Sequence, residues 1–302
     1  MAGVVLKGLR PRDYEHPFDR RALAALESNA TLSAVVAKLN QYGIERTLWL
    51  NYAASNVRAT GGRYLDAVAT LAEAARRLDA VKPPDLYVDW DRLHATVVTV
   101  GTERPLTVLS SLLLDSLSGD ELLFVFGHEL GHLRSRHIVY SQLATVLPVV
   151  GDVLKTATLG IGGLLSSGLQ LSVSNWLRMS DFSADRAGLL ACQDLEVALR
   201  VLLKLGGAVQ VAHPDLDVED FRVQARSFGG YDFDAVDKLT RVVSATRAER
   251  PWTVMRASEL IEWVESGKYD SLLTSTTAGS GAEAAATPPA DPVDPPPPGG
   301  VR

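Results

Sequence analysis

The chain contains little cysteine and little histidine, with one cysteine and six histidines among 302 residues. A single cysteine excludes an intramolecular disulfide and fits a reducing compartment, so Cys192 is expected to be a small buried residue in the middle of a helix. The net charge of -6 argues against nucleic acid as the principal partner. The first 22 residues are polar and charged, without the apolar run of a secretory signal, and we therefore expect a cytoplasmic protein.

Two of the few histidines lie four residues apart in the segment His128-Glu129-Leu130-Gly131-His132. On a helix these two positions share a face, so both imidazoles can point a nitrogen at one zinc ion. Glu129 lies about 100° round the helix, where it can take a proton from a zinc-bound water and return it to a leaving amine. The pattern indicates zinc-assisted hydrolysis of peptide bonds, and the alternative is a pair of solvated helix histidines.

The residues before this segment predict that it lies inside a helix. Ser118 and Glu121 have the spacing of a capping box, and the run from Leu122 to Phe126 is apolar without a break. Gly127 and Gly131 are four apart beside the histidine face, although glycine costs about 1 kcal/mol relative to alanine in a helix interior. We expect a close approach of another backbone at these glycines.

A catalytic zinc site needs a third protein ligand, and the best candidates open a second helical stretch predicted from Ser180 to about Leu205. Asp181 and Asp185 share one face of that helix. One could bind the metal while the other accepts a hydrogen bond from the far nitrogen of a liganding histidine. Alternatively, both carboxylates lie near a helix start and complement its dipole. The same helix carries a band of small residues that suits close packing against another helix: Ala184, Ala187, Gly188 and Ala191.

These motifs resemble those of the M48 family of zinc metallopeptidases, of the gluzincin type, which includes the CAAX-processing endopeptidases. The family pattern is an HExxH helix with a further histidine five residues on, then a Glu-x-x-Ala-Asp element, and later a His-Pro followed by an arginine. Residues 128–132 with His137 match the first element, and residues 181–185 match the second. The resemblance covers roughly residues 80 to 270. It implies that His128, His132 and Asp181 bind zinc and that Asp185 and His137 surround these ligands.

The sequence departs from the family pattern at two places. Asp181 stands where the family has a glutamate, so the second helix must approach more closely or the metal must shift; aspartate is still a competent oxygen ligand of zinc. Arg250-Pro251 stands where the family has His-Pro, with the spaced arginine kept as Arg256. Arg250 or Arg256 would then have to stabilise the oxyanion of the transition state.

The resemblance and the helical patterns together predict an α+β, mainly α-helical, zincin-like fold. Its HExxH active-site helix should be accompanied by a small β-sheet whose edge strand faces the cleft, because β-type segments at residues 85–90 and 94–100 precede that helix. Such an edge strand can pair with an extended substrate. Two further amphipathic helices are predicted at Val218–Phe228 and Met255–Val264.

Three segments are expected along the chain. Residues 1–80, with helices at Asp19–Gln41 and Thr60–Ala80, form an N-terminal helical cap. Residues 81–273 form the metallopeptidase domain. Residues 274–302 are rich in proline, alanine and glycine, cannot bury a core and should be disordered.

Two histidines outside the motif have less specific readings. His94 takes the place of the asparagine in an Asn-Ala pair of the family, or it is an exposed strand histidine. His16 is expected to be a surface residue.

Three readings of the function follow. The leading one is a zinc-dependent metalloendopeptidase that acts on peptide or protein substrates with one zinc ion per chain. The second is a catalytically degenerate peptide-binding or scaffold protein of the same fold, against which the intact Glu129 speaks, because a binding module has no use for a general base. The third is a membrane-associated quality-control protease. It depends on the uncharged residues 156–177, whose glycine and serine content favours a hydrophobic flap over the cleft instead.

Overall fold

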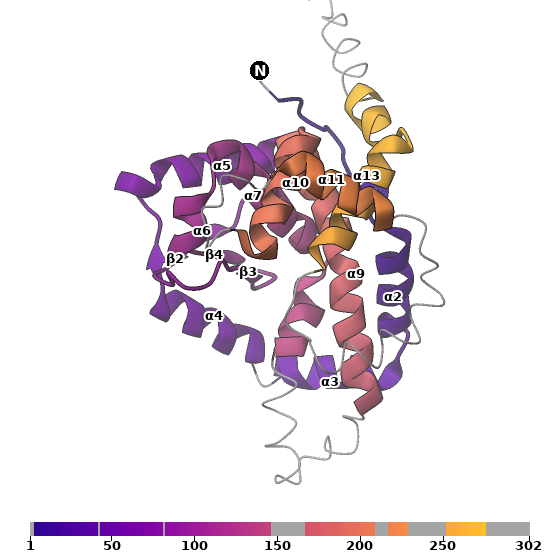
Figure 1. The fold of residues 1–302 in the computed structure, drawn as a ribbon. Coiled ribbons are helices and arrows are strands. Elements are labelled where there is room, and N and C mark those ends of the chain that lie inside the picture. The colour runs from indigo at the N-terminus through magenta and orange to yellow at the C-terminus, as the bar shows by residue number, and fades with distance from the viewer. Residues whose placement is uncertain are drawn as a thin grey trace, which may run out of the picture.

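The computed structural model describes residues 3–41, 43–80, 82–145, 167–208, 217–228 and 252–275. These residues are mainly helical and include one small β-sheet, and Figure 1 shows the helices gathered against that sheet. The helices are α1 (Pro11–Tyr14), α2 (Pro17–Glu27), α3 (Ala30–Gln41), α4 (Ile44–Ser55), α5 (Leu65–Arg77), α6 (Ser111–Ser116), α7 (Gly119–Arg134), α9 (Ser167–Cys192), α10 (Leu195–Leu203), α11 (Val218–Phe228) and α13 (Thr253–Glu265). Shorter helical pieces lie at Gly62–Tyr64, 138–145, Lys204–Ala208 and 268–275.

The sheet has the strand order β1-β2-β4-β3. Its strands are β1 (Val57–Arg58), β2 (Asp85–Asp89), β3 (Val97–Val100) and β4 (Leu106–Ser110). β2 and β4 are parallel, whereas β1 and β3 run antiparallel to their neighbours. β3 is therefore an edge strand.

The predicted strands are confirmed for β2 and, in part, for β3. The second strand begins three residues later than expected, because the backbone N–H of His94 donates to Asp91 Oδ1 at 3.0 Å and holds residues 91–94 in a turn. β1 and β4 were not expected. β4 is buried throughout and passes directly into α6, and a short apolar run of this kind has no periodicity that separates strand from helix.

The helix predicted around the His128–His132 segment is α7, and its start is the capping box expected from the sequence. The Ser118 hydroxyl accepts from the Glu121 N–H at 3.3 Å, while Glu121 Oε2 accepts from the Ser118 N–H at 2.7 Å. The apolar run from Leu122 to Phe126 is buried on all sides. α7 therefore lies in the centre of the molecule, and its histidines are held by a rigid element.

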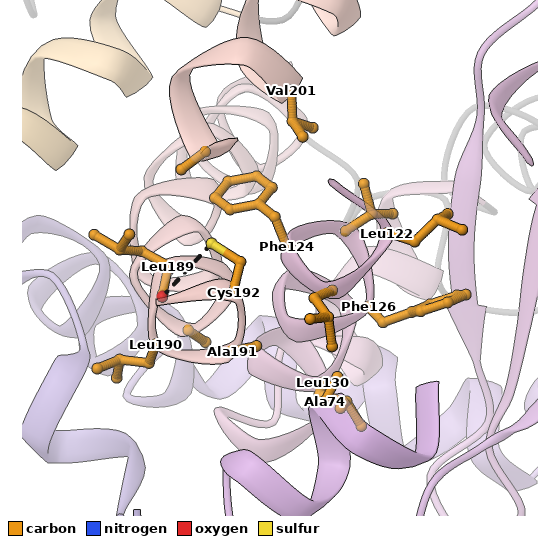
Figure 2. Close-up of a cluster of buried hydrophobic side chains, with 14 of the residues drawn as sticks. Ala74, Leu122, Phe124, Phe126, Leu130, Leu189, Leu190, Ala191, Cys192 and Val201 are labelled. Atoms are coloured by element: carbon orange, nitrogen blue, oxygen red, sulfur yellow. Dashed lines mark hydrogen bonds between the residues drawn. The ribbon is translucent and has the colours of Figure 1, made fainter. Parts of the chain in front are cut away.

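α7 packs closely on α9, as the glycines and small residues of the two helices predict. A Cβ atom placed on Gly127 would lie 2.4 Å from Ala191 Cβ, and one on Gly131 would lie 2.7 Å from Ala187 Cβ. In the other direction, a Cβ on Gly188 would lie 2.8 Å from the Phe124 carbonyl oxygen. Figure 2 shows the side chains of α7 and α9 interlocking beside this contact, with Ala74 of α5 and Val201 of α10 closing the same core.

The second predicted helix is divided differently in the structure. α9 begins at Ser167, well before the expected start at Ser180, and ends at Cys192 instead of continuing to Leu205. Gln193 has a φ of 59°, and the Asp194 side chain accepts the N–H groups of the first turn of α10, so a new helix begins there. Asp181 and Asp185 consequently lie deep inside α9, and the alternative that they complement a helix start is wrong.

The N-terminal region also differs in detail. The single helix predicted at 19–41 is two helices, α2 and α3, because Asn29 Oδ1 accepts the Leu32 N–H at 3.1 Å and caps a new turn. The helix predicted at Thr60–Ala80 is shorter in the structure and corresponds to α5. α4 was not expected, since no side chain described in it is buried and its apolar pattern is weak.

α2 lies alongside α9 in Figure 1, and the two helices share a small core with α3 and residues 138–145. Its buried members are Leu23, Leu26, Leu32, Tyr140, Leu143, Val173 and Trp176. The boundary predicted at residue 80 stays a prediction.

Most of the uncharged stretch at 156–177 and of the tail at 274–302 lies outside the described residues. Residues 167–177 form the first turns of α9, where Val173 and Trp176 are buried against α2 and α3. Within the described ranges, no helix combines the length and the apolar character that crossing a membrane requires.

Candidate metal centre

Three side chains from α7 and α9 converge on one point. The Nε2 atoms of His128 and His132 lie 3.0 Å apart, and Asp181 Oδ1 lies 3.5 Å from His132 Nε2. One potential ligand atom of each of these three residues falls within 4.8 Å of the others. Two imidazole nitrogens and a carboxylate oxygen are a donor set suited to zinc, so the residues present fit this metal.

A pocket of about 880 Å³ opens beside this point. Glu129 and His132 of α7, Asp181 of α9 and Arg256 of α13 lie on its wall, and the edge strand β3 borders it through Val97, Val98 and Thr99. The site is thus placed where an extended chain could reach both the strand edge and the converging side chains.

Asp185 contacts the Nδ1 side of the His128 ring, away from His132. Its Oδ1 atom lies 2.9 Å from His128 Nδ1, and the Arg256 guanidinium donates to both carboxylate oxygens, at 2.7 and 2.6 Å. Burial alone would raise the pKa of Asp185, but Arg256 and His128 together lower it well below its usual range, and Asp185 in turn raises the pKa of Arg256 against its burial. Asp185 is therefore a charged acceptor, and His128 donates to it through Nδ1, so that its Nε2 atom faces His132 Nε2.

Electrostatics also couple the converging residues to one another. Burial lowers the pKa of His132, but Asp181 and Glu129 outweigh this and raise it. Burial raises the pKa of Asp181, but Arg256 and His132 lower it below its ordinary value. Asp181 is consequently an anion at neutral pH, as a metal ligand must be.

His137 lies behind His132. The two Nδ1 atoms are 3.0 Å apart, and the His137 side chain is completely buried. On its other side, His137 Nε2 lies 3.0 Å from Oδ2 of Asp19, a buried carboxylate of α2. His137 is thus placed behind the three converging residues, on the side of His132 that points away from His128 and Asp181.

Comparison with known proteins gives the family. The model of peptidase family M48 matches residues 65–225, just over half of the chain. Over 278 residues the chain is 30% identical to plastoglobule-localized metallopeptidase 48, chloroplastic, of Arabidopsis thaliana, with 89% of this chain and 77% of that protein covered. The chain belongs to peptidase family M48. No solved structure matches it.

The part of this M48 chain that matches the family model contains α7 and α9, and therefore the His128–His132 segment, Asp181 and Asp185. α2 and α13, which contribute Asp19 and Arg256, lie outside the match. The name of this relative places that protein in the plastoglobules of the chloroplast. A cytoplasmic location of this chain stays a prediction.

The other residues singled out from the sequence lie at different distances from the converging side chains. Arg250 lies outside the described residues, whereas Arg256 borders the pocket and is bound by Asp185. His94 is exposed and pairs with Asp91 at 2.8 Å, so it is a loop residue and not a strand residue. The expectation that His16 lies on the surface is wrong, because it is buried, caps α2 and contacts Glu259 Oε2 at 2.7 Å.

Asp19 was not expected near the metal centre from the sequence. An acidic residue in the first turn of a helix that begins with Pro17 is typical of a side chain that complements the helix dipole in water. Nothing in the local pattern indicates that it is 1% exposed or that it faces a histidine more than a hundred positions later.

Proposed function

We propose that this chain is a zinc-dependent metalloendopeptidase with one zinc ion per chain. The observation that carries the proposal is the convergence of His128, His132 and Asp181 beside a pocket that Glu129 lines and an edge strand borders. Membership of peptidase family M48 supports the class of reaction.

The three converging residues would hold the metal. Each histidine offers Nε2, because its Nδ1 atom is engaged behind the ring by Asp185 or by His137. The small residues of α7 and α9 bring the helices close enough for Asp181, one methylene shorter than a glutamate, to reach within 3.5 Å of His132 Nε2. Three protein ligands leave a position open, which is the arrangement of catalytic zinc sites.

Glu129 would be the general base and then the general acid. When bound, zinc acidifies a water molecule and polarises the scissile carbonyl group. Glu129 is on the same helix as both histidines and faces the pocket, so its carboxylate can accept the proton of the attacking water and return it to the leaving amine. It is not needed as a ligand.

The edge strand β3 would bind the substrate. β4 uses one side of β3, and the pocket lies along residues 97–99 of the same strand. An extended peptide can add to such an edge through main-chain hydrogen bonds, and a chain bound in this way presents an internal bond to the site. The substrate class is therefore an extended peptide or an unfolded protein segment.

Arg256 would have two tasks. Its Nε and Nη2 groups fix Asp185, and through it the orientation of His128. Arg256 also lines the pocket, where the N–H groups that Asp185 does not use can stabilise the oxyanion. A comparable task for Arg250 is an expectation from its position in the sequence alone.

The proposal is tested with purified full-length protein by metal analysis and by cleavage of casein. We expect about one zinc ion per chain, cleavage that a chelator abolishes, and recovery of cleavage when zinc is added back. Zinc binding without any cleavage of unfolded proteins would instead support a peptide-binding or scaffold protein, and a protein that binds no zinc would contradict both the cofactor and the mechanism.

A further inference from the structure

Asp19 is a buried carboxylate that receives donors from several elements. Its Oδ1 atom accepts the indole N–H of Trp176 at 3.0 Å, and its Oδ2 atom accepts the hydroxyl of Ser183. The same Oδ2 atom lies 3.0 Å from His137 Nε2. A buried carboxylate is costly unless its lone pairs are used, so the contacts with α9 and residue 137 offset the cost of burying Asp19.

His137 is the link between Asp19 and the metal centre. Its ring is perpendicular to that of Trp176 at 81° and steeply inclined to that of His132 at 68°, so it is clamped between them. The Nε2 atom of His137 is buried and lies 3.0 Å from Asp19 Oδ2, within hydrogen-bonding distance, although the angle of this contact is not that of an ideal hydrogen bond.

The residues at the two ends, Asp19 and His132, determine which atom donates and which accepts in each contact between Asp19, His137 and His132. If His132 binds the metal through Nε2, its proton must be on Nδ1, and the 3.0 Å contact requires His137 Nδ1 to accept it. Because its Nδ1 accepts, His137 must then carry its own proton on Nε2, the nitrogen that faces Asp19. Asp19 can only accept, so the order Asp19, His137, His132 allows a single arrangement of protons.

We propose that Asp19 is a positioning residue of the metal centre, which acts through His137 to fix the tautomer and the ring orientation of His132. The proposal rests on the zinc site described above. His128 has its acceptor, Asp185, in direct contact, whereas His132 reaches its acceptor through one intervening ring. The N-terminal helix α2 therefore belongs to the metal centre, although it lies outside the residues that match the family model.

The first test is Asp19→Asn, with zinc affinity measured by competition with a chelator of known affinity. An amide has only one oxygen, so its NH₂ group must face one of the three donors. If it faces His137 Nε2, the proton of that ring moves to Nδ1 and the His132 proton is forced onto the metal-binding nitrogen. We expect zinc affinity to fall by about 10 to 100-fold, the range seen when partners of liganding histidines are removed.

Glu121→Gln is the matched control. Glu121 is also a buried carboxylate, it pairs with Lys204 at 2.8 Å, and it lies about two helical turns before His128 in α7. Neutralising it should lower the melting temperature without changing zinc affinity. Absorption spectra of the cobalt-substituted proteins give a second readout, because a misdirected imidazole alters the ligand field and a loss of stability does not.

His137→Phe keeps a ring in place but removes both nitrogens. Alone, it should weaken zinc binding to an extent similar to that of Asp19→Asn, and in the double variant the two losses should not add, because both interrupt one chain. Additive losses would mean that Asp19 and His137 act separately.

Unchanged zinc affinity and an unchanged cobalt spectrum in both Asp19→Asn and His137→Phe would overturn the inference, whatever the change in melting temperature. Failure of the proposed function is distinguishable, since it would appear in the unsubstituted protein as absent zinc or absent casein cleavage. Wild-type protein that binds zinc but cleaves nothing still permits the affinity test.

Discussion

Gly127 of α7 lies directly against Ala191 of α9, so that a Cβ atom on the glycine would come within 2.4 Å of Ala191 Cβ and 3.0 Å of the Ala187 carbonyl oxygen. Both obstacles belong to a second helix backbone or to a side chain that cannot rotate away. The absence of a side chain at Gly127 thus sets the distance between the two helices. This distance in turn sets the position of Asp181 relative to the histidines.

Gly127→Ala should lower the free energy of unfolding. Overpacking a rigid contact costs about 1 to 3 kcal/mol, and the better helix propensity of alanine returns at most about 1 kcal/mol. We expect a net loss of roughly 1 to 2 kcal/mol in chemical denaturation, together with weaker zinc binding because α9 is pushed away. Gly119→Ala is the control, since a Cβ atom at the start of the same helix meets nothing within 4 Å. Equal stability of the two variants would show that the helices can separate without cost.

Glu129→Gln should retain zinc but lose most proteolysis. The amide has nearly the same shape as the carboxylate but cannot accept the proton of the attacking water, and general acid–base catalysis typically contributes about 10² to 10⁴-fold. Turnover on casein and metal content, measured on the same preparation, check this. Full activity of the glutamine variant would exclude Glu129 as the base.

His128→Ala and His132→Ala should each lose the metal, because each histidine supplies one of only three protein ligands. Metal analysis after dialysis against a weak chelator is the measurement, with Glu129→Gln as a control that keeps all three ligands. Stoichiometric zinc at wild-type affinity in either alanine variant would contradict the assignment of that ligand.

Asp181 and Asp185 should respond differently to substitution. Asp181 faces the Nε2 side of His132, so Asp181→Ala should abolish tight zinc binding, whereas Asp185 faces Nδ1 of His128, so Asp185→Ala should weaken affinity by about 10 to 100-fold and leave the metal detectable. Asp181→Glu should keep the metal but reduce turnover, because the extra methylene has little room between closely packed helices. If Asp185→Ala lost the metal and Asp181→Ala kept it detectable, the roles assigned to Asp181 and Asp185 would have to be exchanged.

Cys192 should be unreactive in the folded protein. It is buried at the end of α9, and burial raises the pKa of its thiol to about 12, so at pH 8 almost none of the reactive thiolate is present. Labelling with a thiol-specific chromogenic reagent should be slow in buffer and rapid in denaturant. Rapid stoichiometric labelling of the native protein would show that this end of α9 opens easily.

Much of the local structure around the site follows from short sequence patterns. The capping box at Ser118, the apolar run after it and the glycines at 127 and 131 each act within one or two helical turns, and the structure has all of them where the patterns predict. The start of α9 and the strand β4 were not predictable in the same way. Their residues have no caps or alternation that distinguishes the two kinds of structure, and packing against other elements decides them.

The sequence alone determined the chemistry that is available here: two histidines and a glutamate on one helix, with two aspartates one turn apart on another. Only the tertiary structure decided which nitrogen of each histidine faces the other one, that Asp185 lies behind His128, and that a buried Asp19 from α2 lies behind His132 through His137. Helical periodicity places residues a few positions apart, whereas the contact between residues 19 and 137 exists only because α2, α7 and α9 pack together.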